Sequence, residues 1–294
     1  MSIKFRWLGT ACYEIILPSG KVLMVDPYID YSSRSPITSD EVTGADYIAI
    51  THGHPDHCTD TGNLMTRFPH SKVILNHTLA DTMPALYDMD PNRFIRVAAG
   101  DVLEFEDLRV EALKSEHVSP VPALRASYLR LTGERADPAM PLTELREKIN
   151  QLAPRRQPTP ELTEMMAKMK EAGVTFGEQT NYVFQTADNI RIYVYCAGIE
   201  EYLRKQVIDS RANIIFMQLA GVNAGKAAEY AAISGAGVVI PTHHDIEGLE
   251  RGRERAGEMA DHLAARSSAR FIDTEPGKWY EIGLTVTEEQ PEEG

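Results

Sequence analysis

Cysteine is scarce in this chain. The sequence holds 3 cysteines among 294 residues, and Cys12, Cys58 and Cys196 lie far apart. A small, odd and widely spaced set does not form a disulfide framework, and free thiols suit a reducing compartment. We therefore expect a cytoplasmic protein.

Long apolar runs and an excess of basic residues are also missing. No apolar run approaches the roughly 20 residues that a membrane-spanning helix needs. Residues 1–7 alternate polar and apolar side chains and lack the apolar core of a signal peptide. The formal net charge is −13, from 43 acidic and 30 basic residues. This balance argues against nucleic acid and anionic membrane surfaces as partners, because both usually require a basic face.

The composition is that of an ordinary globular protein, with 43% hydrophobic and 25% charged residues. Alternating and short apolar runs predict strands, and apolar residues at helical spacing predict helices between them. The predicted strands span residues 3–8, 13–17, 22–25, 47–50, 73–75, 94–97, 102–105, 108–113, 126–131, 182–185, 190–195, 214–217 and 238–240, with two more near 271 and 279. The predicted helices span residues 60–67, 79–87, 200–208, 226–232 and 251–265. An acidic tail at 288–294 is expected to be disordered.

The strand pattern stops between residues 133 and 177. Apolar residues recur at helical spacing in 142–152 and again in 162–169, on either side of a proline-rich break at 154–160. We predict a helical hairpin inserted into a single domain that spans residues 1–294. Three roles stay open for its apolar faces: packing on the host domain, a contact in a homo-oligomer, or a lid.

Residues 51–57 are the most informative stretch. His52, His54, Asp56 and His57 fall within six consecutive positions, although the chain has only 9 histidines in all. The stretch lies between a predicted strand and a predicted helix, and on such a loop the backbone can aim two neighbouring histidines at one point. Imidazole nitrogens with a carboxylate suit zinc, iron or manganese. The alternative is a solvated polar loop, and we predict a metal site.

The run His-x-His-x-Asp-His resembles the signature of the metallo-β-lactamase fold superfamily of metal-dependent hydrolases. The resemblance implies an α/β fold, a four-layer αββα sandwich with a two-metal site at one rim. The matches extend from Asp26 to His243 and so cover most of the chain outside the insert. Within the superfamily, the chain looks closest to the branch that contains L-ascorbate-6-phosphate lactonase. The branch resemblance lies in residues 9–13, 25–27, 226–229 and 239–243.

The resemblance implies a role for each matching residue. The first metal would take the three histidines His52, His54 and His117, and the second would take Asp56, His57 and His243. His117 follows the predicted strand 108–113, where the superfamily places its next ligand. Asp56 would also hold the attacking water or act as general base.

Three further residues would lie next to these ligands without binding a metal. Asp26 would support the metal loop by hydrogen bonding, as second-shell groups do, although a plain turn residue is the alternative. His244 and Asp245 would either donate a proton to the leaving group or be mere neighbours of the site.

The reaction implied is hydrolysis by metal-bound hydroxide of a small ester, lactone or phosphodiester. Zn²⁺ is the expected ion, with Mn²⁺ or Fe²⁺ as alternatives, and one or two ions per chain. Two rivals stay open: a metal-binding or sensing module without turnover, and an iron oxidoreductase. Diiron relatives typically carry Glu in place of the second histidine of the signature. His54 at that position favours a hydrolase.

One position departs from the pattern. Relatives carry an aspartate that bridges the two metals after the strand here predicted at 190–195, and the matching residue is Ile199. Glu200 is adjacent and longer, so that it could substitute, and Cys196 is either a thiolate ligand or a small buried residue. Without the bridge, two cations repel each other with less negative charge between them. We predict a first site that binds tightly and a second that is weak, partly occupied or empty.

Overall fold

Two seven-stranded sheets form the centre of the protein. The computed structural model describes residues 2–152 and 158–283. The first sheet has the order β14-β1-β2-β3-β4-β5-β6, with strands Trp279–Gly283, Ser2–Trp7, Tyr13–Ile16, Val22–Val25, Tyr47–Ala49, Lys72–Asn76 and Phe94–Val97. The second has the order β13-β12-β11-β10-β9-β8-β7, with strands Arg270–Phe271, Val238–Thr242, Ile214–Gln218, Arg191–Tyr195, Thr180–Thr186, Leu108–Lys114 and Val102–Glu104.

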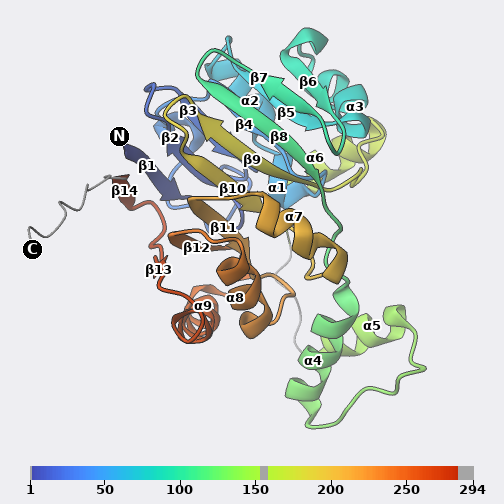
Figure 1. Ribbon diagram of the computed structural model, residues 1–294. Helices are drawn as coiled ribbons and strands as arrows, with labels where there is room; N and C mark the ends of the chain where they lie inside the picture. The colour runs from blue at the N-terminus through green and yellow to red at the C-terminus, as the bar shows by residue number, and fades with distance from the viewer. Residues whose placement is uncertain (1, 153–157, 284–294) are drawn as a thin grey trace, which may run out of the picture.

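Helices cover the outer face of each sheet, so that the predicted αββα sandwich is confirmed (Figure 1). The first sheet carries α2 (Thr61–Arg67), α3 (His77–Tyr87) and α6 (Pro160–Glu171), and the second carries α7 (Arg204–Asp209), α8 (Ala224–Ile233) and α9 (Leu249–Ala264). Within the described ranges, no helix is both long and apolar enough to cross a membrane.

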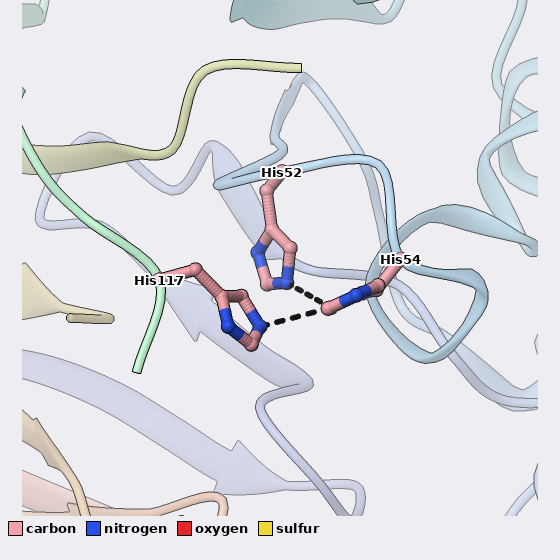
Figure 2. Close-up of side chains that lie close together, drawn as sticks. All are labelled: His52, His54 and His117. Atoms are coloured by element: carbon pink, nitrogen blue, oxygen red, sulfur yellow. Dashed lines mark hydrogen bonds between the residues drawn. The ribbon is translucent and has the colours of Figure 1, made fainter. Parts of the chain in front are cut away.

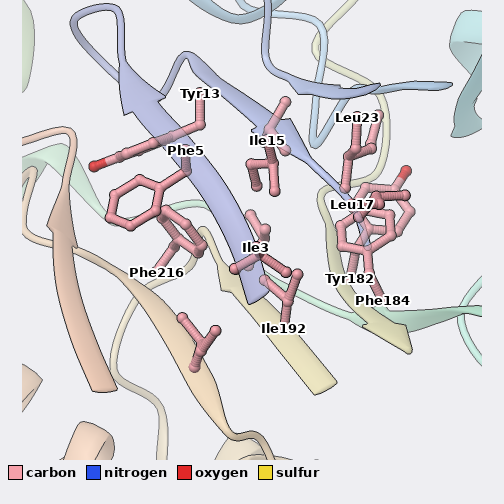
Figure 3. Packing of buried hydrophobic residues seen from close by; sticks show 14 of the residues in the cluster. Ile3, Phe5, Tyr13, Ile15, Leu17, Leu23, Tyr182, Phe184, Ile192 and Phe216 are labelled. Atoms are coloured by element: carbon pink, nitrogen blue, oxygen red, sulfur yellow. The ribbon is translucent and has the colours of Figure 1, made fainter. Parts of the chain in front are cut away.

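The inner faces of the two sheets share one apolar core. Figure 3 shows side chains of β1 and β2 meeting side chains of β9, β10 and β11. The ring of Phe5 meets the ring of Phe216 edge to face, with centroids 5.6 Å apart, and Tyr13 lies 4.5 Å from the same ring. The alternation of the predicted strands therefore places one set of side chains between the sheets.

The strand predicted at residues 126–131 is wrong, because these residues belong to helix α4 (Pro120–Thr132). The signals that delimit this helix lie outside the alternating stretch. The Ser119 hydroxyl caps the first turn by accepting from the amide of Val121, Pro120 occupies the first turn, and Gly133 ends the helix with φ of 76°. The insert therefore begins earlier than residue 133.

The two helices predicted in the insert are present as α5 (Leu142–Leu152) and α6, but they do not share one core. Leu145 and Ile149 of α5 pack with Leu124 of α4 in a separate small cluster. Helices α4 and α5 project away from the sandwich (Figure 1). Met169 of α6 instead joins the cluster beneath α3. Part of the proline-rich break (153–157) and the acidic tail lie outside the described residues. An oligomer contact through the insert stays a prediction.

The segment after α6, residues 174–178, runs across the loop that follows β4. The amide of Gly53 donates to the carbonyl of Phe176 at 2.9 Å, and the amide of Thr180 donates to the carbonyl of Thr51 at 2.9 Å. A Cβ atom at Gly53 would lie 2.1 Å from the carbonyl oxygen of Thr175. The insert thus returns to the sandwich directly over residues 51–57, at a distance that only glycine permits.

This close approach predicts that alanine at Gly53 and alanine at Gly257 change the free energy of unfolding in opposite directions. Gly53→Ala should lower the free energy of unfolding by about 1–3 kcal/mol, because the added methyl group forces two backbone segments apart. Gly257→Ala is the matched control, since nothing lies within 4 Å of its Cβ position in α9, and it should raise stability by up to about 1 kcal/mol. Urea denaturation measures both. Equal stability of the two variants would contradict the packing described here.

Candidate metal centre

Polar side chains follow five strands at the point where each strand ends. Asp26 follows β3, residues 51–57 follow β4, His117 follows β8, Cys196 follows β10 and His243 follows β12. β3 is parallel to β4, and β10 is parallel to β11 and β12. The carboxyl ends of parallel strands meet at the same edge of a sheet, where ligands bind in open α/β sheets. Both sheets therefore contribute residues to one rim of the sandwich.

The first group consists of His52, His54 and His117 (Figure 2). Nε2 of His52 lies 2.6 Å from Nδ1 of His54, and Nε2 of His117 lies 3.1 Å from that same atom. Two nitrogens bound to one tetrahedral zinc ion are about 3.3 Å apart, given bonds of 2.0–2.1 Å. The structure therefore brings together the three histidines of the predicted first site, at nitrogen spacings of 2.6 and 3.1 Å that lie below this value.

A backbone contact sets the tautomer of His117. Its Nδ1 lies 2.9 Å from the carbonyl oxygen of Val118, which can only accept, so that Nδ1 carries the proton. The lone pair is then on Nε2, the atom that faces His54. A hydrogen bond of this kind orients many metal-binding histidines.

The second group consists of Asp56, His57 and His243, whose ligand atoms lie within 4.8 Å of one another. Nε2 of His243 is 3.6 Å from Oδ2 of Asp56, and the rings of His57 and His243 have centroids 5.1 Å apart. The two groups adjoin, because the ring centroids of His52 and His57 are only 4.1 Å apart. All six predicted ligands thus lie at one place, as two neighbouring sets of three.

Asp26 is buried beneath both groups and has a positive φ of 46°. Its Oδ1 accepts from the amide of Thr51 at 2.7 Å, and its Oδ2 accepts from the Thr51 hydroxyl at 2.8 Å. Oδ2 also lies 2.8 Å from Nδ1 of His57, which leaves Nε2 of that ring to face the second group. These contacts are those of the predicted supporting role.

Burial and neighbouring charges set the protonation of the histidines. Burial, together with the adjacent histidines, holds the pKa of His52 well below its usual value, and burial lowers the pKa of His54 to about 4. Burial also acts to lower the pKa of His57, but the Asp26 carboxylate outweighs it and raises that pKa overall. His52 and His54 are therefore neutral at physiological pH, the state that binds metals.

His244 and Asp245 lie outside the three groups of potential ligands. The buried ring of His244 stacks on Trp7 with centroids 4.5 Å apart. The carboxylate of Asp245 accepts from the amide of Thr10 at 3.1 Å. A role for either residue in donating to a leaving group stays a prediction.

Ile199, at the position of the bridging aspartate, and the nearby Glu200 and Cys196 have different surroundings. Ile199 packs against the apolar cluster between the second sheet and its helices, and Glu200 is exposed. Neither residue belongs to a group of potential ligands found in the described ranges. Cys196 does, because its sulfur completes a third group with His52 and His57.

Phe176 is a residue at the rim that sequence reasoning missed. Its ring meets the ring of His54 with centroids 4.1 Å apart, and the side chain is 61% exposed. It belongs to the segment that crosses the loop after β4. Nothing in the sequence indicates this contact, because it depends on where the insert rejoins the sandwich.

Part of the chain matches known proteins in sequence. Residues 4–130 match the model of the Beta-lactamase superfamily domain. A UPF0173 metal-dependent hydrolase from Sulfolobus acidocaldarius is 31% identical over 117 residues, which are 40% of this chain and 51% of that protein. The corresponding protein from Methanosarcina mazei is 37% identical over 128 residues, 43% of this chain and 51% of its own. The chain spans about half the length of the curated relatives that it matches.

Solved structures resemble the chain over nearly its full length. A metallo hydrolase from Ignicoccus hospitalis covers 97% of this chain and 100% of its own, with a TM-score of 0.67 and 14% identity. At such identity the likeness concerns the fold alone. The chain therefore has the metallo-β-lactamase fold, and its residues 4–130 are similar in sequence to the superfamily domain.

Proposed function

We propose that this chain is a metal-dependent hydrolase that acts on a small ester, lactone or phosphodiester. The convergence of His52, His54 and His117 beside Asp56, His57 and His243 carries this proposal. Neutral imidazoles with one carboxylate suit Zn²⁺, and also Mn²⁺ or Fe²⁺. The curated relatives reported above, which bear the name metal-dependent hydrolase, support the reaction class.

The chain's own residues provide the remaining parts of a hydrolytic site. A bound ion would supply a water of lowered pKa and an electrophile for the substrate oxygen. Burial acts to raise the pKa of Asp56, but its hydrogen bond with His243 and the nearby histidines lower that pKa overall. The carboxylate is therefore ionised at neutral pH. Because its side chain is 37% exposed, it can reach a proton on the substrate side and serve as general base.

Two exposed side chains border the first group at the rim. His117 and Phe176 are both exposed and both contact the ring of His54, so that one polar and one apolar side chain border the first group. Among these substrate classes we favour lactones, because residues 9–13 and 226–229 resemble the lactonase-like branch. Residue 10 is tied to the site, since its carbonyl accepts from the amide of His243 at 2.9 Å.

Hydrolysis of a substrate panel tests the proposal. The metal-loaded protein should hydrolyse at least one of a set of lactones, simple esters and phosphodiesters. Asp56→Asn and His52→Ala should each lower kcat by about 10²–10⁴-fold, the usual loss for a general base or an essential ligand. His70→Ala is the matched control, because this exposed histidine contacts Asp46 at 3.4 Å, away from the rim, and it should retain activity.

The two rival functions predict other results in the same assay. A sensing module would bind the metal and hydrolyse nothing in the panel. An iron oxidoreductase would consume oxygen when loaded with iron, without hydrolysis. Either outcome would replace the present proposal.

Acid should release two ions in two steps. Protonated imidazole cannot bind a metal, and as the pH falls His57 gains its proton before His54, because its pKa is raised and that of His54 is lowered to about 4. The ion of the second group should therefore leave at the higher pH. Metal analysis after dialysis between pH 8 and pH 4 measures this order.

Asp26→Asn tests the contribution of the buried carboxylate to this order. Asparagine tolerates the positive φ at this position, but it removes the charge that raises the pKa of His57. Release of the second ion should shift to lower pH relative to the unchanged protein. Release of both ions in a single step, unaltered by Asp26→Asn, would contradict the assignment of His57 to a separate group.

A further inference from the structure

We propose that Cys196 supplies a thiolate ligand to the metal centre, between His52 and His57, at the place where a bridging carboxylate is missing. The proposal rests on the metal binding proposed above, but it does not require turnover. It concerns a residue that the sequence allows to be either a thiolate ligand or a small buried residue.

The position of Cys196 follows from the alternation of β10. Ile192 and Val194 point into the core between the sheets, whereas Tyr193 and Tyr195 point into the cluster beneath the helices. Cys196 continues the inward series one residue beyond the strand. At that height the apolar core ends and the histidines of the rim begin.

The sulfur lies beside both groups of predicted ligands. Sγ of Cys196 and ring nitrogens of His52 and His57 are all within 4.8 Å of one another. These two histidines belong to different groups, so that a ligand atom at this point adjoins both metal positions. Ile199 packs in the opposite direction and Glu200 is exposed.

A plain packing role does not account for Cys196. Cys12 and Cys58 are both members of the apolar cluster on the first sheet. Cys196 is equally buried, but it belongs to no apolar cluster of the described residues. Its sulfur contacts polar groups instead: Gln179, Gln218 and the Thr51 hydroxyl.

Side-chain amides of Gln179 and Gln218 surround the sulfur. Nε2 of Gln179 donates to Sγ at 3.3 Å, and Gln179 is 8% exposed with an Oε1 that has no partner in the described part of the chain. Without metal, the thiol donates to Oε1 of Gln218 at 2.8 Å. On ligation the thiol proton leaves to solvent and the sulfur–metal bond replaces the S–H bond. The Gln218 amide can then turn its NH₂ group toward the sulfur, as outer groups do around metal ligands.

Backbone contacts hold Cys196 at this place. Its amide donates to Oδ1 of Asn181 at 2.8 Å, and its carbonyl accepts from the Ser115 hydroxyl at 3.0 Å. The side chain of Gln179 donates to the same carbonyl. The sulfur is therefore fixed beside the histidines before any ion binds. A soft thiolate in the ligand set favours zinc or cobalt over manganese.

Cobalt substitution tests the assignment without any substrate. The full-length protein loaded with Co²⁺ should show a thiolate-to-cobalt charge-transfer band in the near ultraviolet, besides the visible bands of cobalt bound to histidine. Cys196→Ser keeps the shape of the side chain, and it and Cys196→Ala should both lose this band and bind about half as much cobalt. Cys12→Ala is the matched control, because it removes an equally buried thiol away from the rim, and it should keep the band.

The outcomes separate this proposal from the proposed function. A band that depends on Cys196, in a protein that hydrolyses nothing, would overturn the function and leave the ligand assignment standing. Absence of the band from the unchanged protein, or its survival in Cys196→Ser, would overturn the assignment. A single cobalt ion bound without a thiolate band would also overturn it, and would match the weak second site that the sequence predicts.

Discussion

The hydrogen bonds of one buried carboxylate hold the candidate centre in place. Asp26 accepts from the amide and hydroxyl of Thr51 and contacts Nδ1 of His57, so that it fixes the first and last residues of the loop that carries the histidines. A carboxylate buried between sheets is costly unless its partners satisfy it. Its partners here are the very groups that it must orient. The geometry of the whole rim therefore depends on a residue that faces no substrate.

The insert takes part in this geometry from the opposite side. Residues 174–180 contact the loop after β4 through backbone hydrogen bonds, and the absence of a side chain at Gly53 lets them approach. The loop is thus held both by the side chain of Asp26 and by the backbone of the insert. Helices α4 and α5, by contrast, form a small core of their own away from this contact. The segment after α6 therefore contacts the rim, whereas helices α4 and α5 do not belong to that contact.

Sequence reasoning succeeded where the signal is local. The apolar run before residue 51 and the period of the strands determine the sandwich and the place of the loop. It failed at residues 126–131, because alternation also occurs on a helix whose limits are set by Ser119 and Gly133. It also could not decide whether Cys196 is a thiolate ligand or a small buried residue. That choice depends on the residue at which β10 stops alternating, and a shift of one residue turns a side chain to the other face.

The predicted ligands come from both sheets. His52, His54, Asp56 and His57 follow a strand of the first sheet, whereas His117, Cys196 and His243 follow strands of the second. An ion at either site would be held by residues from both sheets and would crosslink the two halves of the sandwich. The unfolded chain has no such preformed set, so the free energy of binding adds to that of folding. The ion would then stabilise the contact between the two sheets at the rim, where their shared apolar core ends.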